Sequence, residues 1–197
     1  MVVDEKCKIA VLVSGGGTNL QAIIDACKNG RVPSGKIELV ASANPDAYAL
    51  KRAEKNNIKT YVFSSENDLK EKLEKEGIQL IVLAGFLKIL SPDFIKGYEN
   101  RIINVHPALI PSFSGKGCYG IHVHEKALEY GVKVTGATVH FVNEIPDGGK
   151  IIYQKAVKVL DGDTPETLQK RVMEEAEWIL LPKAVEFVSH KILKGEL

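Results

Sequence analysis

Short apolar runs alternate with amphipathic stretches along the first half of the chain. Residues 8–14 form an apolar run that ends in glycines, which is typical of a strand buried on both faces. Residues 19–28 carry apolar side chains at the spacing of one helix face. The same alternation predicts strands at 37–43, 59–63, 78–84 and 101–105, and helices at 46–56, 67–76 and from Pro92, with Ser91 as its cap. Repeated strand–helix–strand units predict a parallel sheet covered on both faces.

The second half of the chain departs from this alternation. Residues 107–119 form a loop rich in proline, serine and glycine, long enough to suggest a function. A helix is predicted at 122–130, and β-rich runs at 132–143 and 151–159 are joined by a turn segment, which predicts an antiparallel hairpin. Thr164 and Pro165 open a long closing helix that Pro182 is predicted to kink or split. The pattern as a whole predicts an α/β fold with a doubly wound, mostly parallel sheet, an antiparallel C-terminal hairpin and a closing helix.

Composition narrows the class of protein. The chain has 197 residues, which suits one domain over residues 1–197, and its 26 basic side chains nearly balance 25 acidic ones. This balance predicts no broad attraction to nucleic acid or to a membrane. No apolar run is long enough to cross a bilayer, and the charged start argues against a signal peptide. The three cysteines, Cys7, Cys27 and Cys118, are odd in number and widely spaced, which predicts free thiols in the cytoplasm.

The glycine-rich segment at residues 14–19 joins the first strand to the first helix. Glycines permit a tight turn and close approach of a ligand, and the free N–H groups of a helix start attract an anion. The segment therefore predicts a phosphate site, with a tight turn that binds nothing as the alternative. Leu20 replaces the third glycine of a dinucleotide fingerprint, and no Gly-Lys-Ser/Thr follows for a nucleoside-triphosphate loop.

A candidate catalytic pair stands at the end of the fifth predicted strand. Asn104 and His106 lie two residues apart, so their side chains point to the same face at the carboxyl edge of the sheet. Histidine can exchange a proton near neutral pH, and an asparagine amide can donate to a developing oxyanion. Asp147 lies in a Pro-Asp-Gly-Gly segment, which is a common turn signal. A carboxylate beside His106 would instead hold the imidazolium form and orient a water molecule.

The other histidines carry weaker signals. His122 and His124 lack a third residue at metal-ligand spacing, so we expect packing at a helix start or lining of the site. His140 alternates within a predicted strand and is expected to be buried in the core or beside the site. His190 lies near the charged C-terminus and is expected to be solvated.

Six segments, met in the same order from about residue 9 to residue 185, carry a family resemblance. They are VLVSGGGTNLQAII, LAGFLKILSP, INVHPALIPSF, GATVHFV, DGGKII and GDTPETLQKRV. Together they resemble the phosphoribosylglycinamide formyltransferases, the folate-dependent enzymes of purine synthesis. The resemblance implies direct transfer of a formyl group from 10-formyltetrahydrofolate, as cosubstrate, to the amine of glycinamide ribonucleotide through a tetrahedral intermediate. It implies no metal, no nucleic-acid or membrane partner, and a monomer or a homodimer.

The resemblance also implies roles for particular residues. Asn104, His106 and Asp147 would be catalytic; Gly16, Gly17, Thr18 and Asn19 would bind the phosphate and Glu177 the ribose; Phe86, Leu87, Lys88, Ile89, Leu90, Asn104, Asn143 and Asp147 would contact the folate; His124 and His140 would line the site. The phosphate-binding half would cover about residues 8–100, and the catalytic, folate-binding half about residues 101–190. The segment GKGCYG is inserted before residue 121, so we expect a larger loop at the rim of the site.

Three alternatives share part of this pattern. A methionyl-tRNA formyltransferase has the same Asn-x-His chemistry but would need a further C-terminal domain and a basic surface for tRNA. A formyltetrahydrofolate hydrolase has the same core but usually carries an extra N-terminal regulatory domain. A nucleotide-binding module would bind phosphate without catalysis. A comparison of formyl-folate loss with and without the ribonucleotide distinguishes transfer from hydrolysis and from binding alone.

Overall fold

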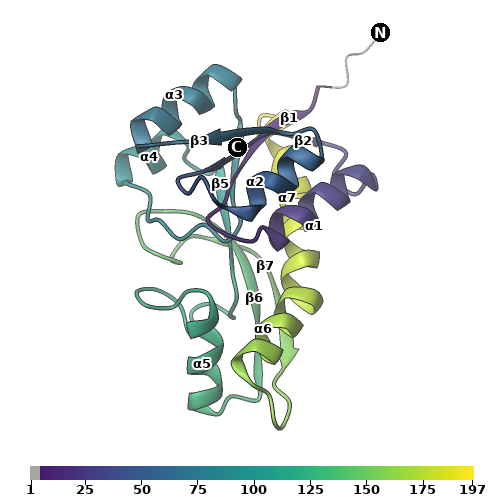
Figure 1. Ribbon diagram of the computed structural model, residues 1–197, viewed down its shortest axis with the longest axis vertical. Helices are drawn as coiled ribbons and strands as arrows, with labels where there is room; N and C mark the ends of the chain where they lie inside the picture. Colours follow the sequence, from purple (N-terminus) through teal and green to yellow (C-terminus); the bar gives the residue numbers. More distant parts are fainter. Residues whose placement is uncertain (1–4) are drawn as a thin grey trace.

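Seven strands form one sheet in the computed structural model, which describes residues 5–197 (Figure 1). The strands are β1 (Cys7–Leu12), β2 (Gly35–Ser42), β3 (Lys59–Val62), β4 (Leu80–Leu83), β5 (Ile102–His106), β6 (Val134–Phe141) and β7 (Ile151–Lys158). Their order across the sheet is β3-β2-β1-β4-β5-β6-β7. The first five pair in parallel, whereas β6 pairs antiparallel with both β5 and β7. The predicted fold class is confirmed.

Helices cover both faces because the central strands are apolar on both sides. The helices are α1 (Thr18–Lys28), α2 (Tyr48–Lys55), α3 (Glu66–Glu76), α4 (Pro92–Gly97), α5 (Ile121–Tyr130), α6 (Pro165–Val172) and α7 (Trp178–Leu193). In β1, Ile9 and Val11 pack into one core with α1, α2 and α7, while Ala10 and Leu12 pack into another with α3 and α4. Burying each large side chain of this kind stabilises the fold by roughly 1.5–3 kcal/mol. None of the helices within residues 5–197 has the length and apolar character needed to span a membrane.

The chain reverses its direction across the sheet between β1 and β4. After β1 the chain moves to β2 and β3 on one side, and β4 then returns to the other side of β1. In such sheets the loops at the carboxyl ends of the strands separate at this point and leave a crevice for ligands. The loops that follow β1, β4 and β5 all border this crevice.

The closing helix is irregular, but not at the predicted position. Thr164 caps α6 by accepting from the N–H of Thr167, and a π-helical turn over Met173–Glu177 separates α6 from α7. Pro182 lies inside α7, which continues from Trp178 to Leu193, so of the two predicted outcomes, a kink or a split, the split is wrong. A proline ring clashes with the carbonyl four residues earlier, here that of Trp178.

Candidate active site

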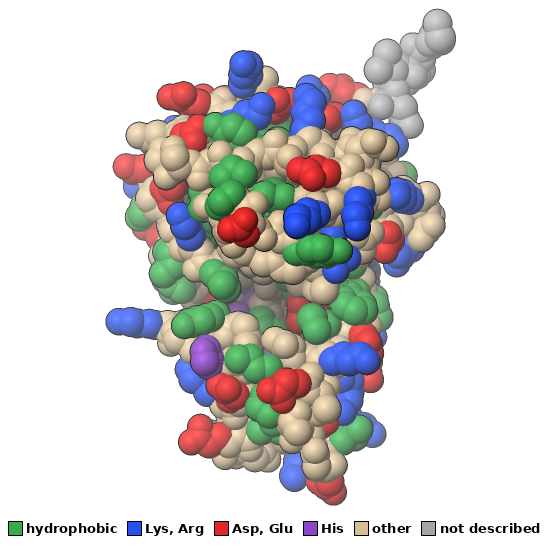
Figure 2. Space-filling view, in the orientation of Figure 1, with side chains coloured by type: hydrophobic (Ala, Val, Ile, Leu, Met, Phe, Trp, Pro, Cys, Tyr) green, Lys and Arg blue, Asp and Glu red, His purple; other side chains and the backbone are tan. Residues whose placement is uncertain are grey.

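Two adjoining pockets open in the crevice at the carboxyl edge of the sheet. The first has a volume of about 300 Å³ and the second about 500 Å³, both within the range of small-molecule sites. Figure 2 shows the hollow across the middle of the molecule. Six residues line both pockets and form their common wall: Phe86, Leu87, Asn104, Cys118, Tyr119 and Asp147. A ligand in one pocket would therefore lie next to a ligand in the other.

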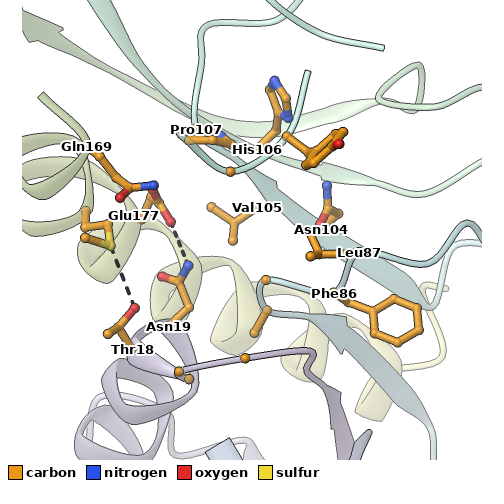
Figure 3. Close-up of a pocket in the computed structure, with 18 of the residues that line it drawn as sticks. Thr18, Asn19, Phe86, Leu87, Asn104, Val105, His106, Pro107, Gln169 and Glu177 are labelled. Carbon is orange, nitrogen blue, oxygen red and sulfur yellow. Dashed lines mark hydrogen bonds between the residues drawn. The ribbon is translucent and has the colours of Figure 1, made fainter. Parts of the chain in front are cut away.

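The glycine loop forms one end of the first pocket (Figure 3). Gly17 has φ of 74° and directly precedes α1, whose first N–H groups have no helical partner. A Cβ at Gly17 would lie 2.6 Å from the Cβ of Ala49, so only glycine fits there. Among residues 5–197, neither the N–H of Gly16 nor that of Gly17 donates to a protein acceptor. Free N–H groups at a helix start favour an anion.

One face of the closing helix lines the first pocket next to the glycine loop. Gln169, Met173 and Glu177 line it at successive spacings of four residues, which places them along one side of a helix. The Nδ2 of Asn19 donates to Oε2 of Glu177 at 2.6 Å, and Thr18 contacts the sulfur of Met173 at 3.8 Å (Figure 3). Sequence reasoning found only Glu177. The four-residue spacing was the signal that would have found Gln169 and Met173.

Glu177 is a buried carboxyl group that lines the first pocket. Burial raises the pKa of Glu177 to about 7, and the hydrogen bond from Asn19 opposes this only in part. The Oδ1 atom of Asn19 is buried and has no protein partner. A carboxyl group that lines a pocket in this way suits a ligand that offers hydroxyl or amine hydrogens.

The three predicted catalytic residues lie together in the common wall region. The Nδ1 of His106 is 3.5 Å from Oδ2 of Asp147, and its Nε2 is 2.8 Å from the carbonyl oxygen of Phe113. Because a carbonyl can only accept, Nε2 carries a hydrogen, and a second proton on Nδ1 would face the carboxylate. Asn104 and His106 both line the first pocket, as the spacing along β5 predicted (Figure 3).

The proton affinity of His106 differs from the sequence-based expectation. Burial lowers the pKa of His106 below its ordinary value, while the charge of Asp147 and the carbonyl of Phe113 raise it. Asp147 therefore acts in the expected direction, but burial outweighs it. The sequence could not show this because the depth of His106 depends on packing around it.

Asp147 is held by the inserted loop, residues 115–120, and lies beside His140. The N–H of Gly115 donates to Oδ2 of Asp147 at 2.8 Å, and Nε2 of His140 lies 3.7 Å from Oδ1. Burial raises the pKa of Asp147, but these contacts and the charge of His106 outweigh it and keep the pKa below its ordinary value. Asp147 is thus an anion, and the inserted loop borders the site as expected.

His140 also orients the amide of Asn104. Its Nδ1 lies 2.8 Å from the carbonyl oxygen of Phe141, so Nδ1 carries the hydrogen and Nε2 is left as an acceptor in the neutral ring. The Nδ2 of Asn104 lies 3.2 Å from this Nε2 and donates to it. The amide of Asn104 consequently has a defined orientation, with its second N–H free for a ligand.

The second pocket has apolar walls and belongs to the loop after β4 and the turn before β7. Leu87 and Ile89 line it although they are 62% and 82% exposed, which is unusual for side chains of this size. Exposed apolar side chains gathered in a concave site indicate an apolar, extended ligand. The remaining predicted folate contacts also line this pocket, and they are Phe86, Lys88, Leu90, Asn104, Asn143 and Asp147.

Residues 7–185 match the family model described as formyl transferase. The chain belongs to the formyl transferase family. This formyl transferase is 42% identical over 178 residues to "Phosphoribosylglycinamide formyltransferase, chloroplastic" of Arabidopsis thaliana, covering 85% of this chain and 61% of the relative. It is 39% identical over 196 residues to "Phosphoribosylglycinamide formyltransferase" of Haemophilus influenzae, covering 95% of this chain and 89% of the relative.

A solved structure has the same fold as this formyl transferase. The glycinamide ribonucleotide transformylase 1 of Symbiobacterium toebii superimposes with a TM-score of 0.86 at 40% identity, covering 94% of this chain and 88% of that one.

Two histidines of the formyl transferase fall in different places. His140 lines the second pocket and contacts Asn104. His124 lines neither pocket. It is fully buried in the first turn of α5, with neither ring nitrogen bonded within the described residues, so of the two expectations packing at the helix start holds and lining of the site does not. His122 is exposed and pairs with Glu125 at 2.7 Å. Within residues 5–197, no three His, Cys, Asp or Glu side chains gather as ligands for a metal ion.

Proposed function

We propose that this formyl transferase moves the formyl group of 10-formyltetrahydrofolate to the amine of glycinamide ribonucleotide, a step of purine synthesis. One observation carries the proposal: Asn104 and Asp147 stand in the wall shared by two pockets, of which the second is the more apolar. A transfer between two substrates needs both held against the same catalytic groups. The names of the relatives support this choice of substrates.

The first pocket would bind the ribonucleotide. The free N–H groups of Gly16 and Gly17 suit its phosphate, as does the start of α1. Glu177, which lines the pocket beside Asn19, suits the ribose hydroxyl groups. The amine would then lie toward Asn104 and His106, at the other end of the pocket.

The second pocket would bind the folate cosubstrate. Its volume of about 500 Å³ and its apolar walls fit a flat ring system with an aromatic extension. Leu87 and Ile89 would be covered by that ligand, while Asn143 and the backbone of the turn offer hydrogen-bonding groups to its polar edge. The fit of these residues to the cosubstrate is consistent with the family.

The side chains in the common wall would catalyse the transfer. As the amine forms a bond to the formyl carbon, the carbonyl oxygen becomes negative, and the free N–H of Asn104 can donate to it. As an imidazolium, a form favoured by Asp147 and by the negative oxygen itself, His106 would place a positive charge beside that oxygen. Breaking the bond to the folate nitrogen then requires one proton to leave the amine and one to reach that nitrogen, and His106 with Asp147 can relay it.

The proposal extends to the domain organisation, cellular location and partners of the chain. Residues 1–197 would act as one domain, with about residues 8–100 supplying the phosphate loop and about residues 101–190 the catalytic groups and the folate pocket. The cytoplasm would suit the free thiols of Cys7, Cys27 and Cys118. Its partners would be these small molecules rather than nucleic acid or membrane, with the chain acting as a monomer or a homodimer.

An absorbance assay tests the function directly. The protein is mixed with 10-formyltetrahydrofolate, with and without glycinamide ribonucleotide, and conversion of the folate is followed. Conversion that requires the ribonucleotide is the expected result. Conversion without it would show a hydrolase, and no conversion in either mixture would show a protein that only binds.

A further inference from the structure

We propose that Arg52 on α2 is a positioning residue that keeps the N–H groups of the glycine loop directed at the phosphate. This inference rests on the proposed function, because it assumes that the first pocket holds a phosphorylated substrate. Arg52 does not line the pocket itself. It acts from behind the loop, through the backbone.

Two backbone carbonyls of the glycine loop are tied to α2. The Nε of Arg52 donates to the carbonyl oxygen of Gly16 at 2.8 Å, and the N–H of Ala49 donates to the carbonyl oxygen of Gly15 at 3.0 Å. Both peptide bonds that follow these carbonyls are trans. In a trans peptide the C=O and the next N–H point in opposite directions. The N–H groups of Gly16 and Gly17 therefore point away from α2.

The pocket lies on the side of the loop opposite α2. No residue of α2 lines the pocket, whereas all three glycines of the loop do. The close approach of Gly17 to Ala49, where a Cβ would lie at 2.6 Å, shows that α2 packs directly against the back of the loop. Turning the two N–H groups away from α2 consequently turns them into the pocket, where they have no protein acceptor.

Arg52 is itself held in place by groups other than the loop. Its guanidinium carbon lies 5.2 Å from the centre of the Tyr48 ring, and its Nη1 lies 3.4 Å from Oε1 of Gln21 on α1. This arrangement uses the flat guanidinium group, which stacks on a ring and donates in fixed directions. A lysine ammonium in the same place could keep the charge but not all three contacts.

Removal of Arg52 would free the carbonyl of Gly16. Glycine has little conformational preference, so this peptide could then rotate and present its oxygen to the pocket. An oxygen facing a phosphate is repulsive where an N–H is attractive, and the positive charge behind the loop would also be lost. Loss of Arg52 should therefore weaken binding of the phosphate, and it should leave the rate of formyl transfer and the binding of the folate unchanged.

The experiment compares Arg52→Ala and Arg52→Lys with the control Lys51→Ala in the full chain. Lys51 is exposed and adjacent in sequence, so its removal takes away the same charge without freeing a loop carbonyl. For Arg52→Ala we expect KM for the ribonucleotide to rise roughly 10- to 100-fold, the range for loss of a hydrogen bond from a charged group. The kcat and the KM for the folate should stay within about two-fold of the parent, and Lys51→Ala should match the parent. The KM of Arg52→Lys for the ribonucleotide should lie between that of the parent and that of Arg52→Ala.

A substrate without the phosphate separates positioning from general damage. With the dephosphorylated acceptor, glycinamide ribonucleoside, Arg52→Ala and the parent should have equal kcat/KM, because the contact affected is missing from both. An equal loss with both acceptors, an unchanged KM in Arg52→Ala, or the same rise in Lys51→Ala would each overturn the inference.

Direct binding keeps this test separate from the proposed function. The Kd for ribose 5-phosphate is measured by calorimetry on the folded parent and variants, with melting temperature as the check on folding. If the parent fails to transfer a formyl group but loses affinity for ribose 5-phosphate on Arg52→Ala, the proposed function fails and the role of Arg52 stands. If the parent binds no ribose 5-phosphate, the inference is wrong.

Discussion

Replacement of Glu177 by glutamine should remove a pH-dependent component of stability. The Glu177 side chain is buried, with Asn19 as its hydrogen-bond partner, and burial raises its pKa from an ordinary 4.5 to about 7. Between these two values the folded protein binds a proton that the unfolded chain does not. The free energy of unfolding contributed by this group is thus full at low pH and is lost as pH rises toward and through the folded pKa.

The magnitude follows from the difference between the two pKa values. A shift from 4.5 to about 7 corresponds to a total of roughly 3 kcal/mol, of which roughly 2–3 kcal/mol is lost between pH 5 and pH 8. Glutamine has the same shape and is neutral, and its Oε1 can accept the same hydrogen bond from Asn19. The variant should therefore become more stable relative to the parent by this amount across that interval.

Urea denaturation at a series of pH values from 5 to 8 measures the effect, with the free energy of unfolding of the variant compared with that of the parent at each pH. Glu175→Gln is the matched control, because Glu175 lies exposed on the same π-helical turn. Its difference from the parent should not change with pH. Parallel curves for Glu177→Gln and the parent would refute the claim that burial controls this carboxyl group.

Three further predictions concern the site. His106→Ala should lower kcat on the order of 10²-fold or more while the melting temperature is kept; near-normal turnover would contradict a catalytic role. Asp147→Asn should lower the pKa of His106 further, since the charge that raises it is lost; an NMR titration of the imidazole that shows no change would count against the pairing. Gly17→Ala should destabilise the fold by roughly 2–4 kcal/mol in urea denaturation, because its Cβ would lie 2.6 Å from that of Ala49 at φ of 74°. Gly16→Ala, with no atom within 4 Å of its Cβ, is the control, and equal losses in both would refute the steric argument.

The order and type of the elements followed from local pattern alone. Apolar runs such as β1 and β4 are buried on both faces, so they signal parallel strands without information from the rest of the chain. The caps at Ser91 and Thr164 were equally local, because each side chain binds a backbone N–H three residues on. The break in the closing helix was predicted at the wrong place. A proline in the sequence shows where a backbone hydrogen bond is missing, but it does not show that the helix widens at Met173–Glu177.

Some features of the candidate site also followed from local pattern, whereas others depended on tertiary structure. Strand periodicity predicted that the side chains of Asn104 and His106 share one face. The place of the glycine loop between a strand and a helix predicted a phosphate site. The meeting of His106 with Asp147, 41 positions later and at 3.5 Å, depends on the antiparallel pairing of β5 with β6 and on the turn that follows. From the sequence, the Pro-Asp-Gly-Gly pattern left this pairing as an alternative to a simple turn, and the resemblance favoured it.

What the sequence determined by itself was therefore the set of segments and their chemistry. Tertiary structure alone decided the pKa of Glu177 and of His106, since burial competes with charge and depends on every element packed around the group. It also decided the placing of Arg52 behind the glycine loop and the exclusion of His124 from the pockets. These features arise from contacts between residues far apart along the chain, which no local pattern encodes.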